Sequence, residues 1–197
     1  GPAIISEPTG TIVIEPGWRG AINPLGHLIL SAQDQAKAVA IDPAVADPVT
    51  LELFNNRYMS IAEQMGIILR NTSQSVNVKE RLDFSCAIFD ADGNLVANAP
   101  HVPVHLGSMD ESVKSILASG QTIAPGDAFV QIIPHRGVSH LPDITVVSPV
   151  FDEEGEAILF FLASRAHHED VGGLSPGSMR PRAATIHEEG VLLDNLK

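Results

Sequence analysis

Residues 157–173 read AILFFLASRAHHEDVGG and decide the fold more than any other stretch of the chain. The first eight residues are almost entirely apolar, which is typical of a strand buried on both faces. We therefore predict a central strand over residues 157–164. Two histidines, two acidic residues and a pair of glycines follow, and glycine permits close approach of the backbone to a ligand. This junction predicts chemistry at one end of a central strand.

The flanking sequence supplies partners for that strand. Apolar runs predict further strands over residues 128–133 and 144–151. A hairpin is predicted over residues 84–98, where the turn Asp-Ala-Asp-Gly-Asn separates two short β-rich runs. Residues 109–118 predict a helix with three apolar residues on one face. The predicted class is α+β, or mixed α/β, with a mixed sheet.

A long amphipathic helix precedes this region. Asp47 can cap it and Pro48 suits its first turn. Apolar side chains then recur at intervals of three and four residues: Leu51, Phe54, Tyr58, Ile61, Met65 and Ile68.

The chain before this helix has a different pattern. Residues 10–31 carry short β-rich runs separated by Pro- and Gly-containing turns, which predicts a small β unit. Residues 31–48 are rich in Ala, Asp and Pro and predict a linker. We therefore divide the chain into residues 3–46 and residues 47–197.

Composition narrows the functional classes. The formal net charge of −12, with no local cluster of Lys or Arg, argues against nucleic acid as a partner. No apolar stretch approaches the length that spans a bilayer, and we expect no membrane association and a cytoplasmic location. The single cysteine, Cys86, lies in an apolar run and is expected to be a buried thiol.

Histidines are concentrated in one part of the chain. Imidazoles and carboxylates together suit a divalent ion such as zinc, manganese or iron, although ion pairs or strand-end caps would also explain them, and no compact HExxH signature is present. The segments SHLPD (139–143) and HHED (167–170) each lie at a predicted strand end. Six of the eight histidines fall between Asn98 and Asp170: His101, His105, His135, His140, His167 and His168.

Two other chemistries lack their sequence signatures. No G-x-S-x-G motif marks a nucleophilic serine, and no G-x-x-x-x-G-K-[ST] motif marks a phosphate-binding loop. The chain is therefore not expected to bind ATP through such a loop.

Five motifs occur in the order found in hydantoinase B/oxoprolinase proteins, and the chain resembles that family. They are RLDFSCA (81–87), HLGSM (105–109), SHLPD (139–143), HHEDVGG (167–173) and PGSM (176–179). Residues 47–197 resemble the N-terminal portion of such a domain and are most similar to ATP-dependent 5-oxoprolinases. Residues 3–46 resemble the end of a hydantoinase A part together with a linker.

The resemblance implies an ATP-dependent hydrolase that opens 5-oxoproline, or a hydantoin-like ring, to the amino acid. A hydantoinase A-type domain or subunit would supply ATP and Mg, and a homo-oligomer is expected. Family members imply a divalent metal, zinc, manganese or iron, held by Asp83, His140, Asp170 and His187. The remaining site residues, Asp143 and His167, would be substitute ligands, or would orient those four ligands or donate protons as catalytic groups.

Two alternatives remain open at this stage. Val138 stands where the family usually has a glycine, and Ile132 also departs from the usual pattern, which favours a non-catalytic relative that acts as a scaffold subunit. The family also includes ketone carboxylases, so a carboxylation reaction is the other alternative.

Overall fold

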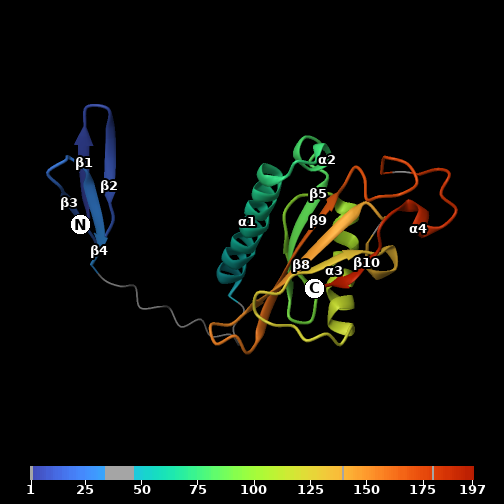
Figure 1. Cartoon of the computed structure of the whole chain (residues 1–197). Coiled ribbons are helices and arrows are strands. Elements are labelled where there is room, and N and C mark those ends of the chain that lie inside the picture. Colours follow the sequence, from blue (N-terminus) through green and yellow to red (C-terminus); the bar gives the residue numbers. More distant parts are fainter. Residues whose placement is uncertain (1, 34–46, 139, 179) are drawn as a thin grey trace. The chain divides into compact units, whose positions relative to one another are not determined.

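The computed structural model describes residues 2–33, 47–138, 140–178 and 180–197 (Figure 1). It divides into two compact units, Gly1–Ala46 and Asp47–Lys197. Most of the linker predicted over residues 31–48 lies outside the described residues.

The N-terminal unit consists of two hairpins. Strand β1 (Ala3–Glu7) pairs antiparallel with β2 (Gly10–Ile14), and β3 (Trp18–Ile22) pairs antiparallel with β4 (Leu28–Ala32). The prediction of a β-rich N-terminal unit is confirmed.

The second unit begins with the predicted long helix, α1 (Pro48–Thr72). The Asp47 carboxylate accepts hydrogen bonds from the Thr50 backbone N–H at 2.9 Å and from its hydroxyl at 2.8 Å. This cap satisfies a donor that the first turn would otherwise leave without a partner. A short helix, α2 (Val76–Lys79), follows α1. Among the described residues, no helix combines the length and apolar character required to cross a membrane.

Six strands form one sheet, with the order β10-β7-β8-β9-β5-β6. All five neighbouring pairs are antiparallel, so the α+β class is confirmed and the sheet is antiparallel rather than mixed. The apolar run after residue 157 forms β9, which pairs with β8 and β5 and is central as predicted. The strands are β5 (Phe84–Asp90), β6 (Leu95–Asn98), β7 (Phe129–Ile132), β8 (Asp143–Phe151), β9 (Ile158–His167) and β10 (Leu193–Leu196).

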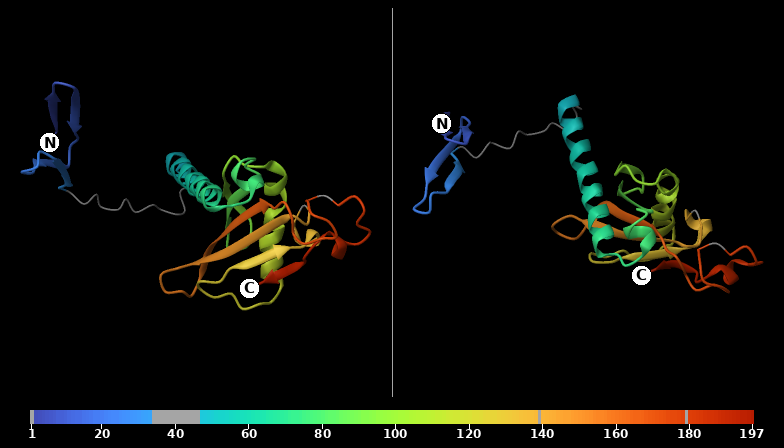
Figure 2. Two further views of the ribbon diagram at one scale, coloured as in Figure 1. Left: turned by 45° about the horizontal axis from the view of Figure 1, so that its top comes forward. Right: turned by 90° about the horizontal axis from the view of Figure 1, so that it is seen from above.

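Helices cover both faces of this sheet (Figure 2). Because successive strand residues point to opposite faces, Phe84 and Cys86 of β5 pack towards α1, whereas Ala87 and Phe89 pack towards α3 (Pro103–Ala118). The larger core lies on the α3 side, where Met109, Val113 and Ile116 of the helix meet Phe129, Val147 and Phe161 of the sheet.

Two predicted boundaries in the second unit differ from the structure by three residues or more. Helix α3 begins at Pro103, six residues before the predicted start, because proline suits the first turn and Gly107 does not prevent helix formation. Strand β9 continues to His167, three residues beyond its predicted end. The charge of Arg165 suggested an end to the apolar run, but its guanidinium is fully hydrogen-bonded inside the protein.

Buried Cys86 is predicted to be unreactive in the folded protein. It has no exposed surface, and burial raises the pKa of its thiol to about 12. Since the thiolate is the reactive form, roughly one thiol in 10,000 would be ionised at pH 8. An aromatic disulfide reagent should release one equivalent of chromophore per chain in denaturant and almost none under native conditions. Rapid reaction of the folded protein would contradict this packing, and Cys86→Ala provides the blank.

Gly137 is predicted to be intolerant of alanine. Its φ is +85°, and an added Cβ would lie 2.6 Å from the Ser108 carbonyl oxygen. Gly126 is a matched control, since its φ is +88° and a Cβ there would meet nothing within 4 Å. Gly126→Ala should cost about 1–2 kcal/mol of unfolding free energy through backbone strain. Gly137→Ala should cost a further ~1–3 kcal/mol through the clash, as measured by urea unfolding. Equal losses of unfolding free energy in the two variants would show that the loop at Gly137 (the 137 loop) can move away from α3.

Candidate metal centre

The antiparallel register brings the ends of three inner strands together along one side of the sheet, which is called the site edge here. Strand β8 begins at Asp143 and β9 ends at His167, and these two residues are Cα partners. Strand β5 begins beside them, with Phe84 opposite Ala166. Asp83 immediately precedes β5, so residues more than 80 positions apart in the sequence meet at this edge.

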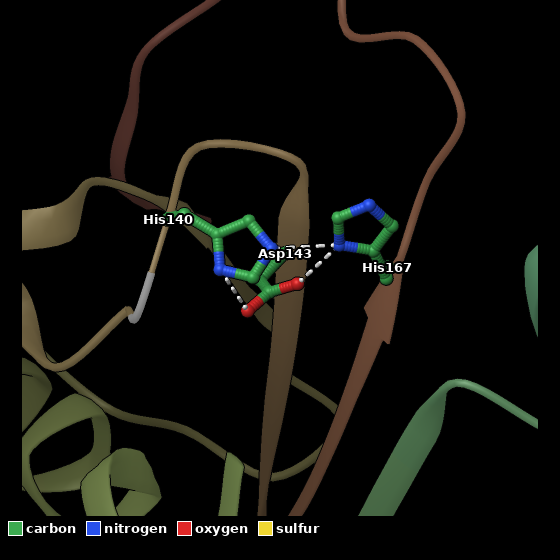
Figure 3. A group of neighbouring side chains, drawn as sticks. All are labelled: His140, Asp143 and His167. Carbon is green, nitrogen blue, oxygen red and sulfur yellow. Dashed lines mark hydrogen bonds and ion pairs between the residues drawn. The ribbon is translucent and has the colours of Figure 1, made fainter. Parts of the chain in front are cut away.

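His140, Asp143 and His167 form a compact group (Figure 3). The His140 Nε2 atom lies 2.9 Å from His167 Nδ1, and the same His167 atom lies 3.0 Å from Asp143 Oδ1. The second carboxylate oxygen of Asp143 lies 3.3 Å from His140 Nδ1. One ligand atom from each residue lies within 4.8 Å of the ligand atoms of the other two. This spacing is close enough for all three atoms to contact one ion.

Burial differs across this group. The Asp143 side chain is completely buried and that of His167 is 11% exposed, whereas His140 is 38% exposed. His140 is therefore the member that faces outwards. It borders a cavity of about 410 Å³ whose wall also includes Ser178, Arg180 and Glu189.

A third histidine lies behind the group on α3. His105 Nε2 is 3.6 Å from Asp143 Oδ2 and 3.8 Å from Asp83 Oδ1. The Asp83 backbone is also fixed, because its carbonyl accepts the His167 N–H at 3.0 Å and its own N–H donates to the Asn77 carbonyl at 2.9 Å. The preceding residue, Leu82, has a φ of +56°, an uncommon backbone conformation for a bulky side chain.

Arg165 attaches α3 to the sheet next to this site. Its buried guanidinium donates to Thr145 Oγ1 at 2.8 Å, Ser108 Oγ at 2.6 Å and Ser112 Oγ at 2.8 Å. It also donates to the backbone carbonyls of His105 at 3.3 Å and Gly137 at 2.7 Å. Burial lowers the pKa of Arg165 to about 10, so the side chain keeps its positive charge at neutral pH.

The surroundings favour neutral imidazoles next to the group. Burial lowers the pKa of His105 below its ordinary value, and the nearby Asp143 carboxylate opposes this only in part. Burial also lowers the pKa of His168, which follows His167 directly after the end of β9. These two histidines lie next to the group and are not members of it.

The other two residues predicted as ligands are not members of this group. Asp170 accepts a hydrogen bond from Arg180 Nη2 at 2.5 Å and is 45% exposed. His187 is exposed on the short helix α4 (Ile186–Glu189). Of the four residues implied as ligands by resemblance, the structure places His140 in the group and Asp83 beside it.

Sequence reasoning gave no role to two residues that support the site. His105 lies in one of the quoted motifs, but its spacing from Asp83 and Asp143 carries no recognisable pattern. The sequence does carry a signal for Arg165, because it is the one Lys, Arg, Asp or Glu in the largely apolar sequence of β9. A charge inside a buried strand is costly without compensating hydrogen bonds and therefore indicates a specific role.

The donor set of the group fits a divalent cation. In the described structure, the His167 Nδ1 atom faces both a carboxylate oxygen and the Nε2 atom of His140. A single proton on this nitrogen can only be shared between those two acceptors, whereas a cation would satisfy all three groups at once. Two imidazole nitrogens and a carboxylate oxygen suit zinc, manganese or iron.

Residues 47–197 match the family Hydantoinase B/oxoprolinase. A protein named 5-oxoprolinase 1 from Arabidopsis thaliana is 49% identical over 198 residues, which cover 100% of this chain and 16% of that protein. This chain therefore spans about a sixth of that relative's length.

Two solved structures share the fold. The ATP-dependent caprolactamase from Pseudomonas jessenii superposes with a TM-score of 0.67 at 28% identity, covering 76% of this chain and 26% of that one. An acetone carboxylase, described in a study of ATP-dependent acetone carboxylation, superposes with a TM-score of 0.71 at 19% identity, covering 77% and 20%. The family match spans the whole second unit, and sequence identity extends along the entire chain. The chain therefore belongs to the hydantoinase B/oxoprolinase family.

Proposed function

We propose that this chain supplies the divalent-metal site of an ATP-dependent hydrolase that opens a small cyclic amide, 5-oxoproline or a hydantoin-like ring, to the amino acid. The observation that carries the proposal is the His140–Asp143–His167 group at the ends of the two central strands. The 49% identity to a 5-oxoprolinase over the whole chain supports this substrate class.

The ion would be held by His140, Asp143 and His167, with Asp83 as the nearest further carboxylate. This set differs in part from the one implied by resemblance, because Asp170 is engaged by Arg180 and His187 is exposed on α4. When bound, the ion would polarise the amide oxygen of the ring or lower the pKa of a water. Asp143, completely buried, would fix the orientation of both imidazoles.

The substrate would approach from the cavity beside His140. This cavity, about 410 Å³, has the size of a site for a small molecule. His140 and His167 are the group members with exposed surface, so they lie on the side of the group that the substrate would reach.

ATP would come from a partner unit. This sequence contains no phosphate-binding loop motif, whereas the caprolactamase that shares its fold is described as ATP-dependent. A hydantoinase A-type domain or subunit would bind ATP and Mg, and residues 3–46 would be the end of such a part. Ketone carboxylation is the second candidate reaction, but acetone carboxylase is only 19% identical and supports the fold alone.

Metal titration of the 197-residue chain tests the ligand set. One Mn²⁺ or Zn²⁺ per chain should bind, and Asp143→Asn should weaken binding by more than ~100-fold, because it replaces the carboxylate that contacts both imidazoles. Asp170→Asn is the matched control and should retain affinity within about threefold, since Asp170 pairs with Arg180. Competition with a chromophoric chelator measures both affinities.

The reverse pattern would reject the proposed ligand set. Strong loss in Asp170→Asn with little change in Asp143→Asn would support the ligands implied by resemblance. Absence of binding by a folded parent chain would instead support the scaffold alternative based on Val138 and Ile132.

Activity is predicted to depend on Asp143 when the ATP-using partner unit is present. In the longer protein that contains this sequence, Asp143→Asn should lower kcat for ATP-dependent ring opening by at least ~100-fold, because the metal site is lost. Release of glutamate from 5-oxoproline, with ADP followed in parallel, provides the assay. Unchanged kcat in a folded Asp143→Asn protein would remove this site from the reaction.

A further inference from the structure

His105 occupies an unusual position between two carboxylates. Its side chain is 1% exposed, and its Nε2 atom lies 3.6 Å from Asp143 and 3.8 Å from Asp83. On the opposite side of the ring, Nδ1 lies 3.3 Å from the Ser85 hydroxyl. His105 thus contacts polar groups through both nitrogens without belonging to the group of three described above.

The neighbours of the ring select one tautomer. Carboxylate oxygens only accept hydrogen bonds, so an Nε2 atom facing two of them is favourable when it carries the proton. The Nδ1 atom then has a free lone pair and can accept from the Ser85 hydroxyl. The opposite tautomer would direct a lone pair at both carboxylates while Ser85 donated to the Val102 carbonyl, 3.3 Å away. These surroundings therefore favour the tautomer with the proton on Nε2, which faces Asp143 at 3.6 Å and Asp83 at 3.8 Å, at ion-pair distances rather than hydrogen-bond distances.

The backbone of His105 is held in place independently. Its carbonyl accepts from the buried guanidinium of Arg165, which also donates to Ser108 one helical turn later. The first turn of α3 is consequently attached to β9, the strand that carries His167. The ring is 1% exposed, so the packing around it sets its position and it can hold the more exposed carboxylate of Asp83.

We propose that His105 is a positioning residue that holds Asp83 beside Asp143, and so adds a second carboxylate to the His140–Asp143–His167 site. The proposal rests on the metal site of the proposed function and extends it. Asp83 is 36% exposed, and among the described residues His105 is the one side chain that pairs with its carboxylate. Without that contact, its carboxylate would be free to turn towards solvent.

Two amide substitutions of His105 distinguish the position of its Nε2 donor from the mere presence of a polar side chain. In His105→Gln the side-chain amide nitrogen reaches the place of Nε2, whereas in His105→Asn the shorter amide reaches only the place of Nδ1. His105→Asn should weaken Mn²⁺ binding about 10- to 100-fold, the range found when a supporting partner of a metal ligand is removed. His105→Gln should restore affinity to within about threefold of the parent. Co²⁺ absorption bands should change in the Asn variant and return in the Gln variant.

A metal-free measurement keeps this test distinct from that of the proposed function. In the 197-residue chain with chelator, the ¹⁵N resonances of His105 should report protonated Nε2 and unprotonated Nδ1. Asp83→Asn should shift the Nε2 resonance, and Asp90→Asn, at the far end of β5, should leave it unchanged. This readout needs no variant at His105 and no bound ion.

The outcomes are separable. If the parent binds no metal, the proposed metal site fails, while the NMR result alone decides whether His105 bridges the carboxylates. A proton on Nδ1, or an Nε2 resonance indifferent to Asp83→Asn, would overturn the bridge. If the parent binds metal and folded His105→Asn binds it equally well, the positioning role is overturned.

Discussion

The guanidinium of Arg165 is the interaction on which the geometry of the site depends. It donates to acceptors on β8, on α3 and on the 137 loop, all inside the protein. Each acceptor left without a partner in a buried position costs on the order of 1–3 kcal/mol. The charge is therefore retained by a complete set of hydrogen bonds, and those bonds attach α3 to β8 and to the loop at Gly137.

The register of the antiparallel sheet places the site residues next to this attachment. Because β8 starts where β9 ends, Asp143 and His167 are paired by strand register rather than by loop conformation. A site built on strand ends is more precisely placed than one built on loops. His140 is added by a tight turn, in which the Asp143 N–H donates to the His140 carbonyl at 3.1 Å. The result is a buried carboxylate next to one sheltered and one accessible imidazole.

Much of the fold could be predicted from the sequence. Strand and helix periodicity located α1, the β5–β6 hairpin and central β9, because each pattern is local. The end of β9 was missed because a charged side chain normally indicates the surface, and the acceptors that bury Arg165 come from distant segments. Strand β10 was also missed, since its short polar sequence carries no clear alternation.

The candidate site was predictable in part. The resemblance implied Asp83, His140, Asp170 and His187 as ligands, with Asp143 and His167 in supporting roles. Sequence alone could not show which of these six residues converge. That depends on register, which pairs Asp143 with His167 and leaves Asp170 to Arg180. The role of His105 depends on a helix packing across the sheet, which no spacing in the sequence reveals. The homo-oligomeric state expected from the resemblance stays a prediction.

A crystal structure of the chain grown with Mn²⁺ or Zn²⁺ would test the central claim most directly, through the anomalous signal of the ion. The account predicts one strong peak at about 2.0–2.2 Å from a nitrogen of His140, a nitrogen of His167 and an oxygen of Asp143. A peak held by Asp170 and His187, or a crystal with ordered side chains at the site edge and no peak there, would contradict it.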